Sequence, residues 1–149
     1  MKKVEKNTEI RVWRGEIPVF YLYTPGVAGE KFFQSLKEGK LIASKCPECG
    51  KRYIPPRIYC EECLCDIEDY FEVPNSGVVE SWSEVYLTAD ENFLEKPSLI
   101  ALVKIDGTDG KLILKALEGV EIGDRVEIVF EKKRVGGMKD IKGVRKIPL

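Results

Sequence analysis

The chain has 149 residues, of which 44% are hydrophobic and 33% charged, and its formal net charge is -1. This composition predicts a folded protein, and no apolar run approaches the roughly 20 residues that a membrane-spanning helix needs. Histidine is absent, which removes the commonest general base and argues against an independent enzyme.

Charge is distributed unevenly. Residues 58–95 hold eleven acids and no lysine or arginine, whereas residues 132–149 hold seven basic residues and one acid. This asymmetry indicates either solvated faces of opposite sign or docking surfaces for a charged partner. The N-terminus shows neither an apolar stretch nor a small-residue cleavage site, so we expect a cytoplasmic protein whose cysteines bind metal instead of forming disulfides.

We expect an N-terminal unit, residues 1–40, made of an arm and a helix. Residues 8–23 carry aliphatic and aromatic side chains without a clean period, and the run 17–23 is apolar enough for a short strand. Such an arm either packs on its own domain or presents an apolar interface to another protein.

A short amphipathic helix is predicted over residues 30–38. Pro25-Gly26 breaks the chain before it, and Gly39 is placed to cap its C-terminus. The apolar face consists of Phe32, Phe33 and Leu36. We expect this face to cover the neighbouring units.

Two Cys-x2-Cys pairs dominate the second predicted unit, residues 41–74. The first is Cys46-Pro47-Glu48-Cys49, followed by Gly50 and nine further residues, and the second is Cys60-Glu61-Glu62-Cys63. Each pair supplies two sulfurs from one tight turn, as a tetrahedral thiolate metal site requires. The spacing therefore predicts a rubredoxin-like zinc ribbon, with strands near residues 41–43 and 53–54. The predicted metal ligands are Cys46, Cys49, Cys60 and Cys63.

The two turns differ at one position. Gly50 permits the positive φ with which a turn wraps its amides around the sulfurs, whereas the second turn has Leu64 there. Cys65 is an alternative fourth ligand; we favour Cys63 because it keeps the Cys-x2-Cys geometry. Four thiolates leave no open position for substrate, so the site is predicted to be structural zinc, with redox iron as the alternative.

The third predicted unit, residues 75–149, alternates apolar and polar residues in short runs separated by glycine-rich turns. Its five predicted strands cover residues 78–87, 99–106, 111–117, 126–130 and 141–147. In the first of these strands the alternation places Val79, Ser81, Ser83, Val85 and Leu87 on one face and Val78, Trp82 and Tyr86 on the other. Five such strands favour a small antiparallel barrel of OB type, with a half-open sandwich as the alternative. The connection between the third and fourth of these strands is too short for a helix.

The order of these parts resembles the family of zinc-ribbon plus OB-fold, acyl-CoA-associated proteins known as domain of unknown function family 35. The resemblance covers roughly residue 29 to the C-terminus. The motifs that carry it are Glu38-Gly39-Lys40-Leu41, Cys46-Pro47-Glu48-Cys49-Gly50, Pro55-Pro56-Arg57, Cys60-Glu61-Glu62-Cys63, Gly77-Val78-Val79-Glu80-Ser81-Trp82-Ser83 and Val120-Glu121-Ile122-Gly123-Asp124-Arg125-Val126. The fold this implies is mainly β: a helical N-terminal arm, a zinc ribbon and an OB-like barrel.

The resemblance also implies a function. Family members are non-catalytic partners of thiolase-fold enzymes, and in archaea some join acetoacetyl-CoA thiolase to 3-hydroxy-3-methylglutaryl-CoA (HMG-CoA) synthase, so that acetoacetyl-CoA passes within one assembly of the mevalonate pathway. Others accompany thiolases or hydratases in steroid side-chain breakdown. Lysine- and glutamate-rich composition and short length favour the archaeal role.

Contact with coenzyme A and binding of nucleic acid are two further hypotheses. Basic side chains near the ribbon, or those between residues 132 and 146, are candidates for the phosphorylated ADP head of coenzyme A; the ribbon set is Lys51, Arg52 and Arg57. Zinc ribbons and OB barrels also bind single-stranded nucleic acid, but a pI near 5.7 and an acidic middle argue against that function.

Overall fold

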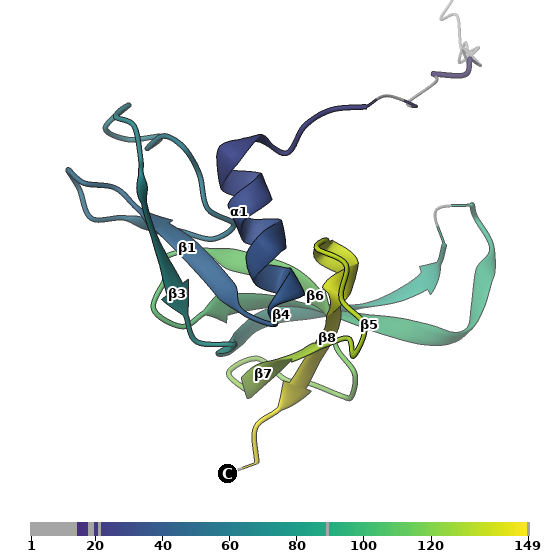
Figure 1. Ribbon diagram of the computed structural model, residues 1–149. Helices are drawn as coiled ribbons and strands as arrows, with labels where there is room; N and C mark the ends of the chain where they lie inside the picture. Colours follow the sequence, from purple (N-terminus) through teal and green to yellow (C-terminus); the bar gives the residue numbers. More distant parts are fainter. Residues whose placement is uncertain (1–14, 18–19, 21, 89, 149) are drawn as a thin grey trace, which may run out of the picture.

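The computed structural model describes residues 15–17, 20, 22–88 and 90–148. One α-helix, eight strands and a short 3₁₀ helix lie in this part of the chain, which confirms the mainly β fold with an N-terminal helix (Figure 1). In chain order they are α1 (Gly26–Lys37), β1 (Leu41–Lys45), β2 (Arg52–Tyr53), β3 (Asp69–Val73), β4 (Ser76–Leu87), β5 (Phe93–Ile105), β6 (Lys111–Lys115), β7 (Arg125–Phe130), η1 (Met138–Asp140) and β8 (Ile141–Lys146).

The predicted arm over residues 8–23 lies largely outside the described residues. Of those described, Ile17, Phe20 and Leu22 are exposed and belong to no helix or strand. The choice between a packed arm and an interface therefore stays a prediction.

Helix α1 begins at Gly26, four residues before the predicted start at residue 30. Pro25 takes φ -69°, a value that its ring favours and a helix requires, so it precedes the helix directly instead of separating it from the arm. At the other end, Gly39 has φ +76°, and its N–H donates to the Leu36 carbonyl at 2.9 Å. The predicted glycine cap is therefore present.

The helix is anchored by its apolar face. Phe32 and Leu36 are 2% and 0% exposed, and Phe33 packs beside them. Burying the first two side chains is worth about 3–6 kcal/mol in transfer free energy. At the C-terminal end of the helix, the Arg134 Nε–H donates to the Lys37 carbonyl at 2.9 Å, so this carbonyl of the last turn has a partner.

Strands β2, β1 and β3 form the sheet of the ribbon, in that order and all antiparallel. Residues Leu41, Ala43 and Val73 are buried on one face of this sheet. They join a core that also contains the helix residues and the interior of the second sheet. The ribbon, the helix and the second sheet therefore pack around one continuous core.

The second sheet has five strands in the order β6-β5-β4-β7-β8. Its two end strands meet where Ala116, just past β6, forms a parallel bridge with Val144 of β8, and the Leu117 N–H donates to the Val144 carbonyl at 2.9 Å. The sheet is thus a closed, OB-like barrel rather than a half-open sandwich, and residues 116–124 contain no helix, as predicted.

The alternation predicted along β4 is wrong beyond Val79. Val79 pairs with Val103, but the next pairs are Ser81 with Leu102 and Trp82 with Ala101, so Glu80 is one extra residue on β4. Because directly paired residues share a face, Trp82 lies on the same face as Val79 and not opposite to it. A bulge of this kind reverses the period-2 pattern, and the sequence alone does not show it.

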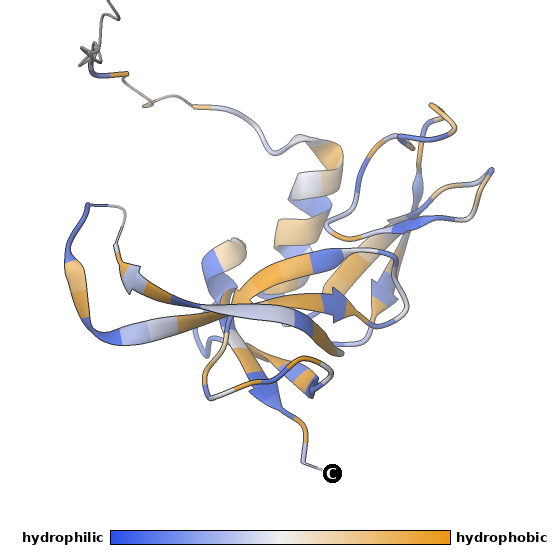
Figure 2. Cartoon of the chain, turned by 180° about the vertical axis from the view of Figure 1, so that it is seen from behind, coloured by the Kyte–Doolittle hydropathy of each residue, from blue (hydrophilic) through white to orange (hydrophobic). Residues whose placement is uncertain are grey.

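Strands β4 and β5 are longer than the barrel. β5 begins at Phe93, six residues before the predicted start at residue 99. β4 pairs with β7 only at Ser76, Gly77 and Val78, and β5 pairs with β6 only from Ile100 onward. The outer parts, residues 81–88 and 90–99, form a two-stranded projection that we call the β4–β5 arm (Figure 1, Figure 2).

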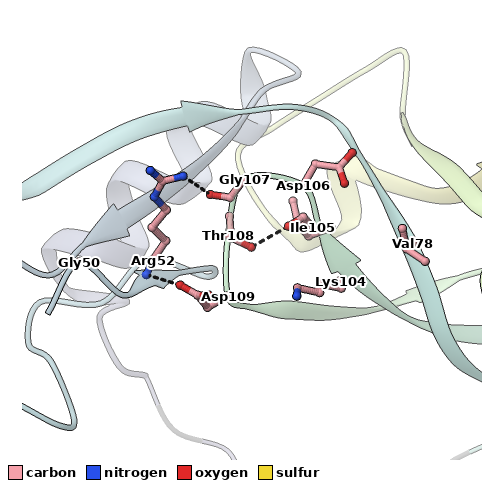
Figure 3. A pocket seen from close by; sticks show the side chains of 9 residues that line it. All are labelled: Gly50, Arg52, Val78, Lys104, Ile105, Asp106, Gly107, Thr108 and Asp109. Atoms are coloured by element: carbon pink, nitrogen blue, oxygen red, sulfur yellow. Dashed lines mark hydrogen bonds between the residues drawn. The ribbon is translucent and has the colours of Figure 1, made fainter.

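The ribbon meets the barrel at the β5–β6 turn. The Arg52 N–H donates to Asp109 Oδ2 at 2.9 Å, and the Asp109 N–H donates to the Arg52 carbonyl at 2.9 Å. The Arg52 guanidinium also donates to the Gly107 carbonyl at 3.2 Å (Figure 3). A Cβ added at Gly110 would lie 2.6 Å from the Ile54 carbonyl oxygen, so the two units touch backbone to backbone.

Candidate metal centre

The first Cys-x2-Cys turn closes on its own backbone. The Cys46 N–H donates to the Lys51 carbonyl at 2.9 Å, and the Gly50 N–H donates to the Cys46 carbonyl at 3.1 Å. Gly50 takes φ +73°, as predicted, and the Cys49 N–H points at the Cys46 sulfur at 3.4 Å. The turn therefore presents both sulfurs on one side, with amide donors around the first.

The second turn repeats this pattern. The Cys60 N–H donates to the Cys65 carbonyl at 2.9 Å, the Leu64 N–H donates to the Cys60 carbonyl at 3.0 Å, and the Cys63 N–H points at the Cys60 sulfur at 3.5 Å. Leu64 takes φ +57° at the position that Gly50 holds in the first turn. Cys65 thus occupies the place of Lys51, which is not a ligand position.

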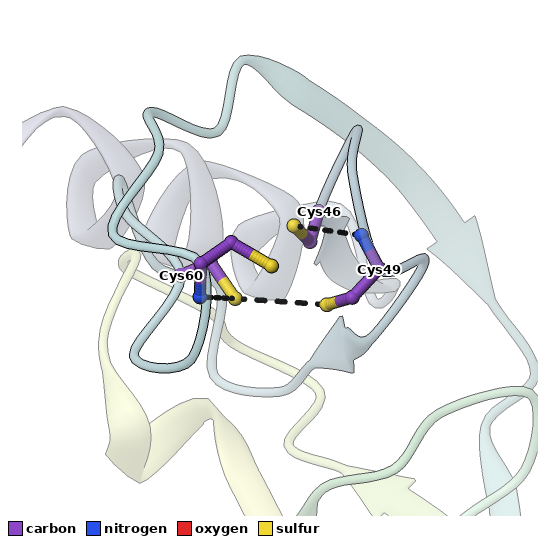
Figure 4. A group of neighbouring side chains, drawn as sticks. Cys46, Cys49 and Cys60 are labelled. Carbon is purple, nitrogen blue, oxygen red and sulfur yellow. Dashed lines mark hydrogen bonds between the residues drawn. The ribbon is translucent and has the colours of Figure 1, made fainter.

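The four predicted cysteines lie together between the two turns, and Figure 4 shows Cys46, Cys49 and Cys60 pointing toward one another. The sulfurs of Cys46, Cys49, Cys60 and Cys63 all lie within 4.8 Å of one another, and Cys49 Sγ is 3.7 Å from Cys60 Sγ. A tetrahedron with Zn–S bonds of about 2.3 Å has edges of about 3.8 Å, so the donor set fits a tetrahedral ion. The backbone hydrogen bonds of the two turns bring these donors to one side of each turn.

The electrostatics of the cluster favour a bound cation. Burial opposes ionisation of Cys46, but the backbone N–H groups of Cys49 and Glu48 lower its pKa to about 6. The Cys49 sulfur and burial raise the pKa of Cys63 well above its ordinary value. Without a cation, the crowded sulfurs therefore share fewer than four negative charges, whereas a divalent ion would bind all four as thiolates.

Two residues beside the ligand set complete its surroundings. The Tyr53 hydroxyl lies 3.2 Å from Cys60 Sγ, and this hydrogen bond is the main reason that the pKa of Cys60 is lowered. Cys65 Sγ lies 3.5 Å from Cys46 Sγ, and burial, followed by that neighbour, raises the pKa of Cys65 to about 11. Sequence reasoning missed Tyr53, although its position between the two cysteine pairs was a usable signal.

The basic residues near the ribbon are bound within the chain. Lys51 Nζ contacts Glu61 at 2.9 Å and Glu62 at 2.6 Å, and the Arg57 guanidinium contacts Glu61 at 2.7 Å. Arg52 is held at the β5–β6 turn, beside an open pocket of about 620 Å³ that Lys104 also lines (Figure 3). The basic groups of Lys51, Arg52 and Arg57 are therefore held in contacts within the chain.

The basic set between residues 132 and 146 is only partly paired. Arg134 holds the end of α1, Arg145 pairs with Glu127, and Lys146 pairs with Asp124. The remaining members, which form no ion pair within the described residues, are Lys132, Lys133, Lys139 and Lys142. They surround the β7–β8 connection and are the free cations of this end of the barrel.

Comparisons with known proteins agree with the geometry. Residues 33–65 match the model of the ChsH2 rubredoxin-like zinc ribbon domain, and residues 70–131 match the model of the ChsH2 C-terminal OB-fold domain. The centre is thus a zinc ribbon whose four cysteines are positioned for a metal ion, consistent with structural zinc.

Two relatives share the label "DUF35 domain-containing scaffold protein". The one from Methanothermobacter thermautotrophicus is 31% identical over 103 residues, covering 65% of this chain and 76% of the relative. The one from Methanocaldococcus jannaschii is 28% identical over 101 residues, covering 65% of this chain and 72% of the relative.

Two solved structures are similar. A DUF35-family protein of unknown function from Sulfolobus solfataricus aligns with TM-score 0.61 and 38% identity over 70% of this chain and 78% of the other. An Ltp2–ChsH2(DUF35) aldolase chain aligns with TM-score 0.59 and 21% identity over 78% of this chain and 91% of the other, which shows the shared fold. No helix among the described residues has the length and apolar character to cross a membrane.

Proposed function

The chain belongs to the DUF35 family of zinc-ribbon and OB-fold proteins, and from this premise we propose that it is a non-catalytic scaffold subunit of an acyl-CoA-processing enzyme complex. The observation that carries the proposal is the closed cysteine cluster, which has four donors and no place for a substrate. Two archaeal relatives are named scaffold proteins, and their alignments with this chain cover 76% and 72% of their length.

In this proposal the metal is a structural clamp. Zinc bound by Cys46, Cys49, Cys60 and Cys63 fixes the two turns that shape the ribbon, and such binding is worth about 10–16 kcal/mol to a small module. Tyr53 donates a hydrogen bond to the Cys60 thiolate and orients it. We propose units at residues 1–40, 41–74 and 75–149, with the clamp fixing the shape of the middle one.

The finer proposal names the partners. We infer acetoacetyl-CoA thiolase and HMG-CoA synthase, which the family resemblance implies and with which the archaeal source of the relatives is in keeping. The scaffold would hold the two enzymes together in the cytoplasm, so that acetoacetyl-CoA formed by one reaches the other without leaving the assembly. The solved relative in an Ltp2–ChsH2 aldolase offers a parallel in which the same fold accompanies an enzyme.

Binding of single-stranded nucleic acid is the second function considered. Trp82 and Tyr86 lie on one face of β4, as a base-stacking platform requires, but Glu84 lies between them and accepts a hydrogen bond from the Tyr86 hydroxyl. Repulsion between this carboxylate and phosphate opposes that function.

Co-purification tests the proposal. The tagged, zinc-loaded chain, the thiolase and the synthase of the same organism are co-expressed, and the eluted material is resolved by size and analysed for protein and zinc. The proposal expects one complex that contains all three chains and zinc. Enzymes that elute separately from the chain would overturn it, and a metal content of iron instead of zinc would overturn the assignment of the clamp.

A further inference from the structure

We propose that the segment joining β7 to β8 is a docking surface for a different protein, one whose contact surface carries carboxylates around an apolar centre. The inference rests on the scaffold function proposed above and names a surface through which one of the two enzymes is held. We call this segment the basic loop. It consists of residues 131–142, which include the first two residues of β8, and it lies beside α1 (Figure 1).

The connection is longer than a strand reversal needs, and a buried side chain holds its tip. It fills residues 131–140, whereas a hairpin turns in about two to five residues. The carboxylate of Asp140 is 2% exposed. It accepts the N–H groups of Val135 at 2.9 Å, Gly136 at 2.7 Å and Gly137 at 3.3 Å. A tip that is already hydrogen-bonded loses less conformational entropy when a partner docks on it.

Arg134 ties the basic loop to the helix. Its Nε–H donates to the Lys37 carbonyl at 2.9 Å, and its Nη1 donates to the Glu131 carbonyl at 3.0 Å. The Glu131 N–H in turn donates to the Asp140 carbonyl at 2.7 Å and closes the base of the loop. The loop is therefore held against the C-terminal end of α1, and the Arg134 guanidinium is used for that purpose.

The basic loop exposes apolar and cationic side chains together. Val135 is 70% exposed and Met138 is 43% exposed. The exposed lysines, none of which forms an ion pair with another described residue, are Lys132, Lys133, Lys139 and Lys142. Two apolar side chains among unpaired cations offer a partner both a desolvated contact and charges to neutralise.

Neighbouring acids do not cancel this charge. Residues 131–142 hold five basic residues and two acids, and one of those acids is the buried Asp140, whose oxygens accept backbone N–H groups. At the adjoining end of α1, Lys37 and Glu38 carry opposite charges. The surface is therefore positive, and electrostatic complementarity selects an acidic partner.

The composition of the loop decides which kind of acidic partner fits. Residues 131–142 contain no aromatic side chain on which a base could stack, so the loop lacks what single-stranded nucleic acid requires. Two copies of this chain joined through the same loop would bring like charges together. The occupant is therefore a different protein with carboxylates around an apolar contact, and its association should weaken as salt is added.

The experiment measures the affinity of the full-length, zinc-loaded chain for purified thiolase and purified synthase in separate titrations at several salt concentrations. The test variant is Lys133→Glu with Lys139→Glu. The control is Lys96→Glu with Lys104→Glu, which changes the net charge equally at two exposed lysines of β5. The molar mass of the wild type alone and its titration with a single-stranded DNA oligonucleotide are measured in parallel. Melting curves and zinc content verify that each variant is folded.

A third variant, Asp140→Asn, tests the hydrogen bonds that hold the tip. It makes the loop more positive, but the amide has one acceptor oxygen and turns an N–H donor toward the backbone N–H groups. We expect it to bind the enzyme more weakly than the wild type despite its added positive charge. Binding as tight as that of the wild type would overturn the part assigned to Asp140.

The expected result is that one enzyme binds the wild type and the β5 control alike, and binds the test variant about tenfold or more weakly and with less dependence on salt. Equal binding by the test variant and the control would overturn this inference alone. Wild type that binds neither enzyme would overturn the scaffold function and the inference together. Association with a second copy or with the oligonucleotide that Lys133→Glu with Lys139→Glu abolishes, in place of binding to an enzyme, would overturn the choice of partner.

Discussion

Replacing Gly110 with alanine tests how the ribbon is fixed to the barrel. A Cβ at this position would lie 2.6 Å from the carbonyl oxygen of Ile54, 2.7 Å from its Cγ2 and 2.8 Å from its backbone nitrogen. Two of these atoms belong to the backbone, so no rotamer change relieves the collision. The ribbon must move away from the β5–β6 turn, which strains the reciprocal hydrogen bonds between Arg52 and Asp109.

Gly110→Ala should lower the free energy of unfolding by about 1–3 kcal/mol, because it overpacks a tight contact. A further loss of about 1 kcal/mol is expected if one of the two hydrogen bonds breaks. The melting temperature of the zinc-loaded chain should then fall by several degrees, at about 2–4 °C per kcal/mol for a chain of this size. Gly119→Ala is the matched control, because a Cβ there meets nothing within 4 Å. Equal melting temperatures for both variants would refute the close junction.

Three further predictions test the turns and the barrel. Leu64→Gly should raise the melting temperature of the zinc form, with a gain of up to about 1 kcal/mol, because Leu64 holds φ +57° while 80% exposed; a lower melting temperature would contradict this. Cys63→Ser should abolish stoichiometric zinc by elemental analysis while Cys65→Ser keeps it, and the reverse ranking would make Cys65 the fourth ligand. Asp106→Asn should destabilise the chain near neutral pH, with a difference from wild type that shrinks in acid. Arg125 lowers the pKa of Asp106 below 3.8, although burial opposes this effect. The Asp106 carboxylate therefore contributes its full stabilisation above pH 3.8 and loses it as the pH falls through the lowered pKa. A difference in stability that persists in acid would contradict this.

Local rules sufficed for the parts of the fold that depend on a few neighbouring residues. The four cysteines predicted the metal cluster because a tetrahedral site requires two pairs of close donors. Gly39 and Gly50 predicted left-handed positions, and both have positive φ. The glycine-rich turns likewise separated the barrel strands, since they mark reversals of the chain whatever surrounds them.

The errors arose where tertiary contacts decide the outcome. Glu80 forms a bulge because β4 leaves its pairing with β7 and continues along β5, which no local pattern announces. Leu64 adopts a glycine-like conformation because the sulfur cluster and the backbone bonds of the turn impose it. Strand β5 begins six residues early, at Phe93, since pairing with β4 extends it through Pro97.

The function of the basic residues was also beyond a sequence reading. Lys51 and Arg57 look like free cations in the sequence, but the fold places Glu61 and Glu62 against them.

The most direct test of the account is the mass of the assembly formed when the chain is co-expressed with acetoacetyl-CoA thiolase and HMG-CoA synthase. Native mass spectrometry of the purified material should show one complex that contains both enzymes, the chain and one zinc ion per copy of the chain. A chain that carries zinc but is found alone, beside both enzymes in unbound form, would contradict the scaffold function.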